Sequence, residues 1–117
     1  MTLTFYGLKT CDTCRKAQKA LAAAGHELSV VDVRADGVPR AVLSGWLKLL
    51  GPGPLVNTRS TTWRGLTEAE RAGAQTLAGV EALLCAHPTL IKRPVIVAGD
   101  QVHIGWTAAV QKALLPG

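Results

Sequence analysis

Residues 2–25 have the sequence TLTFYGLKTCDTCRKAQKALAAAG, and the class of fold can be inferred from them. Its first five residues alternate weakly and are rich in β-branched and aromatic side chains, which indicates a strand. Residues 12–24 carry apolar side chains at three- and four-residue spacing, which indicates a helix that closes at Gly25. The two cysteines, Cys11 and Cys14, therefore lie where a strand passes through a loop into a helix.

Cys11 is the better nucleophile of the pair because of its position. At the first turn of a helix, unpaired backbone N–H groups and the positive end of the helix dipole both stabilise a thiolate. We therefore expect the pKa of Cys11 to lie below the roughly 8.5 of a free cysteine. Arg15 and Lys16 add positive charge nearby. Cys14 lies one turn further in and is expected to resolve a mixed disulfide formed on Cys11. The alternative for Cys14 is a small buried helix residue.

A CxxC pair between a strand and a helix is typical of a redox site, but two other uses stay open. Zinc would need two more ligands at a matching spacing, which is not found among Cys85, His26, His87 and His103. A structural disulfide is rare in the cytoplasm, where we place the protein because the chain shows no secretory leader. We therefore predict thiol chemistry, with no metal and no bound cofactor. Cys85 follows two leucines and is expected to be part of the core.

The composition narrows the classes of function. With 117 residues, of which 48% are hydrophobic, the chain is long enough for one domain with a modest core. The net charge of +5 suits an anionic partner such as glutathione or an oxyanion. The basic residues are dispersed and aromatic residues make up only 4%, so we expect no direct nucleic-acid binding. No apolar run approaches the roughly 20 residues that span a membrane, so we expect no membrane binding. We also expect a monomer.

The rest of the chain continues the alternation of elements. Residues 28–33 are rich in β-branched valine and predict a second strand, which completes a βαβ unit. The remaining expected segments are a helix from Pro39 to about residue 50, a rigid turn over 51–54, an irregular stretch over 55–66, a helix opened by a capping box of Thr67 and Glu70, a helix over 76–86, strands over 90–97 and 101–105, and a helix capped by Thr107. This order predicts an α/β fold with a mixed four-stranded sheet, βαβ then ββα. We expect a single domain, residues 1–117, with a helical insert at about 39–88.

Three ordered segments resemble the ArsC/Spx family, the glutaredoxin-like arsenate reductases and their relatives. They are YGLKTCDTCRKA at residues 6–17, NTRS at 57–60 and LIKRPV at 90–95. A further run, TTWR at 61–64, is similar to one in the small YffB-type proteins. The resemblance covers essentially the whole chain and implies a thioredoxin-like fold.

The resemblance also implies roles for individual residues. Cys11 matches the family's nucleophile, and Arg59 and Arg93 match two of its anion-binding arginines. Pro94 matches the proline whose preceding peptide bond is cis in this fold. For the two arginines, an ion pair with Asp or Glu is the alternative. Apart from these implied roles, the residues that we expect to contact substrate are Lys9, Thr13, Arg15, Arg64 and Pro94. For Lys9 and Arg15, a solvated surface position is an equal alternative.

The expected function is that of a glutathione-dependent thiol-disulfide reductase, with Cys11 as nucleophile and Cys14 or glutathione as resolving thiol. Arsenate reduction linked to glutathione or glutaredoxin is one alternative. The reductases carry a third arginine after the hairpin, however, and this chain has no arginine beyond Arg93. The other alternative is an Spx-like redox-sensing regulator with RNA polymerase as its partner. Spx-type regulators have a CxxC and a Gly-aromatic pair resembling residues 105–106.

Overall fold

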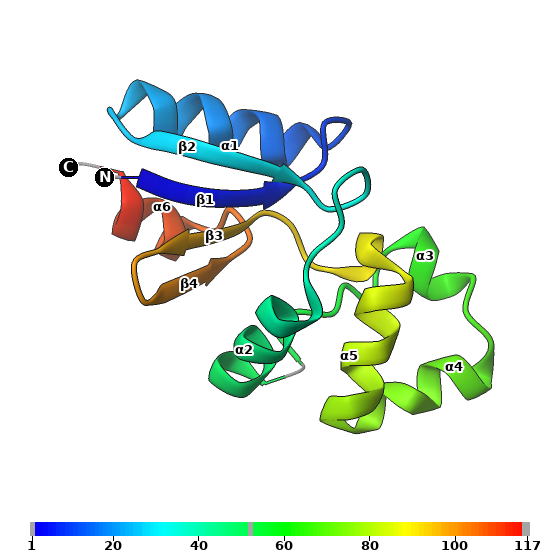
Figure 1. Ribbon diagram of the computed structural model, residues 1–117. Helices are drawn as coiled ribbons and strands as arrows, with labels where there is room; N and C mark the ends of the chain where they lie inside the picture. Colours follow the sequence, from blue (N-terminus) through cyan, green and yellow to red (C-terminus); the bar gives the residue numbers. More distant parts are fainter. Residues whose placement is uncertain (1, 52, 116–117) are drawn as a thin grey trace. The chain divides into compact units, whose positions relative to one another are not determined.

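The computed structural model describes residues 2–51 and 53–115, which divide into two compact units. One unit combines the chain up to Asp36 with the chain from Arg93 onward, and the other consists of Gly37–Lys92. The elements follow the predicted order of β-α-β, then helices, then β-β-α (Figure 1).

The first unit contains the sheet. Its strands are β1 (Thr2–Gly7), β2 (Glu27–Asp32), β3 (Val95–Ala98) and β4 (Gln101–Ile104), in the spatial order β2-β1-β3-β4. β1 pairs with β2 in parallel, whereas β1 with β3 and β3 with β4 are antiparallel. Helix α1 (Asp12–Ala23) makes the connection from β1 to β2. The predicted thioredoxin-like α/β fold with a mixed four-stranded sheet is thus confirmed.

One face of this sheet carries the core of the unit. Alternate residues of β1 and β3 point to that face, and α1 packs on it together with α6 (Ala108–Leu114). The buried members are Leu3, Phe5, Cys14, Ala17, Leu21, Ile96, Ala98, Val110 and Leu114. Cys14 belongs to this core, so the second cysteine of the CxxC pair is held by packing.

The second unit is helical. It comprises α2 (Arg40–Leu50), α3 (Thr61–Arg64), α4 (Glu68–Ala72) and α5 (Leu77–Ala86), with short 3-10 turns at Gly73–Gln75 and Pro88–Leu90. The predicted capping box is present, because the Thr67 hydroxyl accepts from the Glu70 N–H while the Glu70 carboxylate accepts from the Thr67 N–H. Thr76 caps α5 by accepting from the Gly79 N–H at 3.0 Å.

The structure corrects three expectations in the second half of the chain. Cys85 is exposed and is not part of the core. Val80 and Leu84 are the buried residues of α5, and Cys85 lies about 100° further round that helix. The stretch 55–66 contains helix α3, which begins where the Ser60 hydroxyl accepts from the Trp63 N–H. The strand expected over 90–97 is shorter, since β3 begins at Val95.

The turn predicted over 51–54 contains Pro52, which lies outside the described residues. At its start, Gly51 has a φ of 78°, in the left-handed region that favours glycine. In the part of the chain that the structure describes, every helix is too short or too polar to cross a membrane.

Candidate active site

Cys11 occupies the position between the first strand and the first helix. A tight turn follows β1, closed by a hydrogen bond of 3.2 Å from the Cys11 N–H to the Leu8 carbonyl. Cys11 is the N-cap of α1, with extended φ and ψ of −88° and 117°, and its carbonyl accepts the first helical hydrogen bond from the Arg15 N–H at 3.0 Å. Its half-buried side chain therefore lies at the positive end of a 12-residue helix.

The surroundings of Cys11 stabilise its thiolate. Burial alone raises the pKa of Cys11, because it disfavours the charged form. Hydrogen bonds from the backbone and thiol of Cys14, together with the charge and a hydrogen bond of the Arg93 guanidinium, outweigh this effect. The pKa of Cys11 is therefore lower than that of an ordinary cysteine, in the direction that the sequence predicts.

Cys14 has the opposite character. Its side chain is fully buried, and burial raises the pKa of the Cys14 thiol to about 11. The neighbouring Cys11 raises it further, while a backbone hydrogen bond from Leu8 and the charge of Arg93 lower it. One thiol of the pair is thus accessible and readily ionised, and the other is shielded and held protonated at neutral pH.

Gly7 is a site residue that sequence reasoning missed. A β-carbon at this position would lie 2.9 Å from the Cys14 sulfur and 2.9 Å from Cε1 of Phe5, both closer than normal contact. Only a glycine lets the strand pass this close to the buried thiol. The available signal was a glycine at the end of a strand directly before the cysteine loop, where it marks a close approach.

Arg93 reaches the thiols from the segment that leads into β3, where Pro94 follows it. The Arg93–Pro94 peptide bond is cis, as the resemblance implied. The Pro94 carbonyl accepts a hydrogen bond of 2.7 Å from the N–H of Gly105, whose φ of 81° favours glycine. Gly105 thereby fixes the segment from which Arg93 reaches Cys11, and it too was not predicted as a site residue.

Three further predicted residues lie at or next to this loop. Lys9 is exposed, and its backbone N–H donates to Oδ2 of Asp32 at 3.3 Å, which ties the loop to the end of β2. Thr13 is exposed on the first turn of α1. Arg15 is also exposed and forms an ion pair with Asp12 on the same turn, so its charge is partly matched.

Arg59 and Arg64 belong to the helical unit. The Arg59 N–H donates to the Asn57 side chain at 3.1 Å in the turn that leads into α3, and Arg64 is in the last turn of that helix. Both side chains are exposed. Their part in substrate binding stays a prediction.

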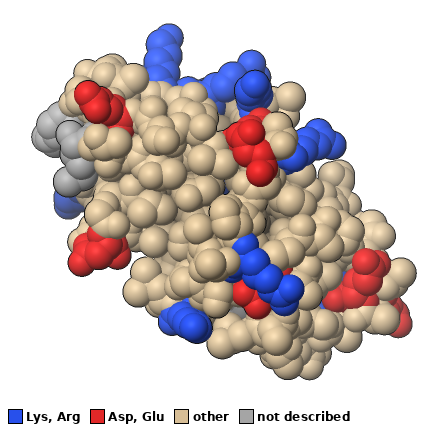
Figure 2. Space-filling model, in the orientation of Figure 1, with Lys and Arg blue, Asp and Glu red and all other residues tan. Residues whose placement is uncertain are grey.

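The other titratable side chains are dispersed. Within residues 2–51 and 53–115, no three His, Cys, Asp or Glu side chains gather as ligands for a metal ion. His26 is engaged with the Leu114 carbonyl at 2.6 Å. Basic and acidic side chains are interspersed over the face shown in Figure 2. The described site is therefore built from two thiols, one guanidinium and the backbone around them.

Comparison with known proteins finds matches over nearly the whole chain. The model of the ArsC family matches residues 6–114. An uncharacterized protein of Haemophilus influenzae is 39% identical over 104 residues, which cover 89% of this chain and 90% of that protein.

Two solved structures are similar over nearly their full length. A protein named YFFB (PA3664) is 32% identical with a TM-score of 0.90, and the match covers 97% of this chain and 99% of that one. An arsenate reductase (ArsC) related protein from Brucella melitensis is 32% identical with a TM-score of 0.75, over 97% and 93% of the two chains.

Proposed function

The chain belongs to the ArsC family, and on that premise we propose that it is a glutathione-dependent thiol-disulfide reductase with Cys11 as its nucleophile. The observation that carries the proposal is the contrast between the two thiols beside Arg93. The pKa of Cys11 is lowered, whereas that of Cys14 is raised to about 11. A thiolate is the attacking species in disulfide exchange, so the first step belongs to Cys11.

In the first step the Cys11 thiolate attacks one sulfur of a disulfide substrate. A bond forms between Cys11 and that sulfur, the substrate's S–S bond breaks, and the second sulfur leaves as a thiolate that takes a proton from water. Arg93 stabilises the attacking thiolate before this step. Because its charge lies at the thiol, it also suits an anionic group on the substrate.

The second step releases the mixed disulfide. Cys14 gives up its proton to water and its sulfur attacks the Cys11 sulfur. The bond between Cys11 and the substrate breaks, the substrate leaves as a thiolate that takes up a proton, and a Cys11–Cys14 disulfide remains. Two molecules of glutathione then reduce that disulfide and become oxidised glutathione. Alternatively, one glutathione attacks the mixed disulfide directly. Because the pKa of Cys14 is raised, Cys14 stays a protonated thiol, which is a poor nucleophile, until Cys11 has reacted.

The test is glutathione-coupled oxidation of NADPH in the presence of glutathione reductase, with a glutathione mixed disulfide as substrate. We expect Cys11→Ser to abolish turnover and Cys14→Ser to leave only the direct route through glutathione. Cys85→Ser is the matched control, because Cys85 is exposed and lies in α5. Full activity of Cys11→Ser would refute the assignment.

Arsenate is a second candidate substrate. It is supported by the named similarity to an arsenate reductase (ArsC) related protein and by the Arg93 guanidinium at the thiol, since guanidinium groups bind oxyanions well. Replacing the mixed disulfide with arsenate in the same coupled assay separates the two. Binding of RNA polymerase, the regulatory alternative, stays a prediction of the resemblance alone.

A further inference from the structure

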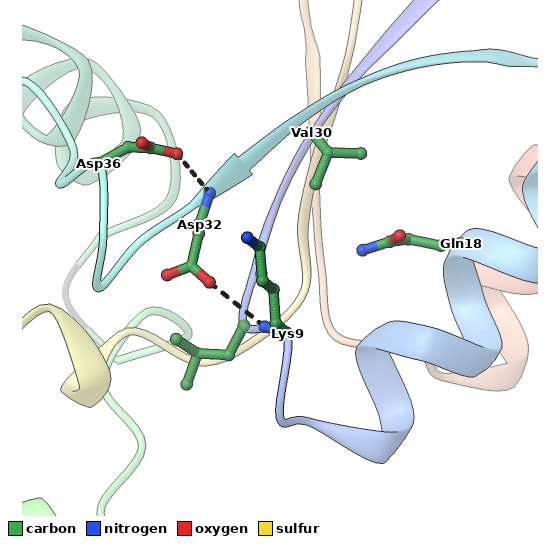
Figure 3. Close-up of a pocket in the computed structure, with 7 residues that line it drawn as sticks. Lys9, Gln18, Val30, Asp32 and Asp36 are labelled. Atoms are coloured by element: carbon green, nitrogen blue, oxygen red, sulfur yellow. Dashed lines mark hydrogen bonds between the residues drawn. The ribbon is translucent and has the colours of Figure 1, made fainter.

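A hollow of about 270 Å³ lies beside the cysteine loop. It is found at the carboxyl ends of the parallel strands β1 and β2, where ligands of open α/β sheets bind. Figure 3 shows α1 on one side of it and the end of β2 on the other. The lining side chains are Leu8, Lys9, Gln18, Val30, Asp32 and Asp36.

The hollow has one positive and two negative groups. The Lys9 side chain runs from the cysteine loop toward Val30, between Asp32 and Gln18 (Figure 3). Asp32 accepts from the backbone N–H groups of Lys9, Arg34 and Ala35, which hold its carboxylate in place. The N–H of Ala35 is the largest of the causes that lower the pKa of Asp32, so this carboxyl stays ionised. Asp36 accepts from the Asp32 N–H through Oδ2 at 3.1 Å.

An apolar surface accompanies these charges. Val30 pairs with the buried Phe5, which puts it on the face of the sheet that α1 covers. Nevertheless Val30 is 51% exposed. The apolar side chain therefore faces the hollow and not the core, and it offers a contact for methylene groups.

The hollow is within reach of the reactive thiol. Leu8 lines the hollow, and its carbonyl accepts from the Cys11 N–H in a tight turn. The two Cα atoms of such a turn lie within about 7 Å of each other. A group that enters the hollow while its sulfur meets Cys11 must therefore lie several bonds away from that sulfur.

These features define one chemical class of ligand. A carboxylate fits the Lys9 ammonium, an ammonium fits the carboxylate of Asp36 or Asp32, and a short aliphatic chain fits Val30. A phosphorylated thiol such as coenzyme A would instead bring several negative charges toward two carboxylates. We propose that this hollow binds the zwitterionic α-amino-acid head group of the thiol substrate, carried on an aliphatic chain as in a γ-glutamyl thiol. The proposal rests on the proposed function and adds the substrate feature that the site selects.

The first test measures binding without turnover. The probe is S-methylglutathione, which has the γ-glutamyl head group but no free thiol, titrated into the ¹⁵N-labelled full chain. We expect amide shift changes at Lys9, Gln18, Val30 and Asp36, and binding at least several-fold weaker for the analogue in which a glutaryl group replaces γ-glutamyl. Equal binding of both compounds, or shift changes only elsewhere, would overturn the proposal.

The second test uses conservative variants. Lys9→Met and Asp36→Asn remove one charge each, and Asn at position 36 can still accept from the Asp32 N–H. Because these side chains are exposed, we expect the dissociation constant for S-methylglutathione to rise about three- to tenfold. Lys19→Met and Asp100→Asn, which change exposed charges outside the hollow, are the controls and should leave it unchanged. Unchanged binding in both hollow variants would overturn the proposal.

The two proposals fail separately. Cys11-dependent turnover together with shift changes outside the hollow overturns the head-group site and leaves the reductase. Binding of S-methylglutathione in the hollow without any turnover overturns the reductase and leaves the head-group site.

Discussion

Replacing Gly7 with alanine should destabilise the protein and disturb its second thiol. The added methyl carbon would lie 2.9 Å from the Cys14 sulfur and 2.9 Å from the Phe5 ring. Both neighbours have no exposed surface, so neither can turn away into solvent. Forcing an extra methyl group into a packed core costs about 1–3 kcal/mol, and we expect about 2 kcal/mol here because two neighbours must shift. For a domain of this size that corresponds to a fall in Tm of roughly 6–12 °C.

Thermal unfolding followed by circular dichroism measures this effect. Gly45→Ala is the matched control, because Gly45 is exposed within α2 and a β-carbon there meets no atom within 4 Å. Alanine is the better helix former, so the control should stabilise the protein by about 0.5–1 kcal/mol. The same displacement should slow formation of the Cys11–Cys14 disulfide on addition of oxidant. A Tm for Gly7→Ala within about one degree of the unmodified protein would refute the packing argument.

Three further predictions concern the charges and thiols. Arg93→Met should raise the pKa of Cys11, because the variant loses a positive charge and a hydrogen bond to the thiolate. When the rate of alkylation by iodoacetamide is plotted against pH, its inflection should therefore lie at a higher pH in the variant. An inflection at the same pH would contradict the role of Arg93. Burial raises the pKa of Cys14 to about 11 in the folded state, so the protonated thiol is favoured by folding. The stability that this contributes is fully present below the pKa of an unfolded cysteine and is lost as the pH rises through about 11; urea unfolding of the reduced protein at a series of alkaline pH values should show this loss, and Cys14→Ala should reduce it. Cys85, being exposed, should react with a maleimide in the native reduced protein, whereas Cys14, being buried, should react only after unfolding; mass spectrometry of the labelled peptides decides between this and uniform labelling.

The fold around the thiols could be predicted because its signals are local. A strand, a loop with CxxC and a helix follow one another within residues 2–25, and each has its own periodicity. The capping box of Thr67 and Glu70 is similarly contained in four residues. The position of Cys11 at the helix start therefore followed from the sequence, together with the direction of its pKa shift.

Other features depend on residues that are far apart in the sequence. Position 7 has to be a glycine because Cys14 and Phe5 pack against it. Arg93 lies at the thiol because β3 pairs with β1. The exposure of Cys85 depends on which side of α5 is covered, which the two leucines before it did not reveal. The hollow at the end of β2 arises from the spacing of α1 and β2 and has no sequence motif.

Trapping the mixed disulfide would show whether Cys11 is the nucleophile and Cys14 the resolving thiol. The reduced Cys14→Ser variant is mixed with oxidised glutathione, and the site of the added glutathionyl group is located by peptide mass spectrometry. We expect rapid modification of Cys11, with a stable mixed disulfide in this variant and only a Cys11–Cys14 disulfide in the unmodified protein. Modification of Cys85 alone, or a Cys11 that stays free while oxidised glutathione is consumed, would contradict this assignment.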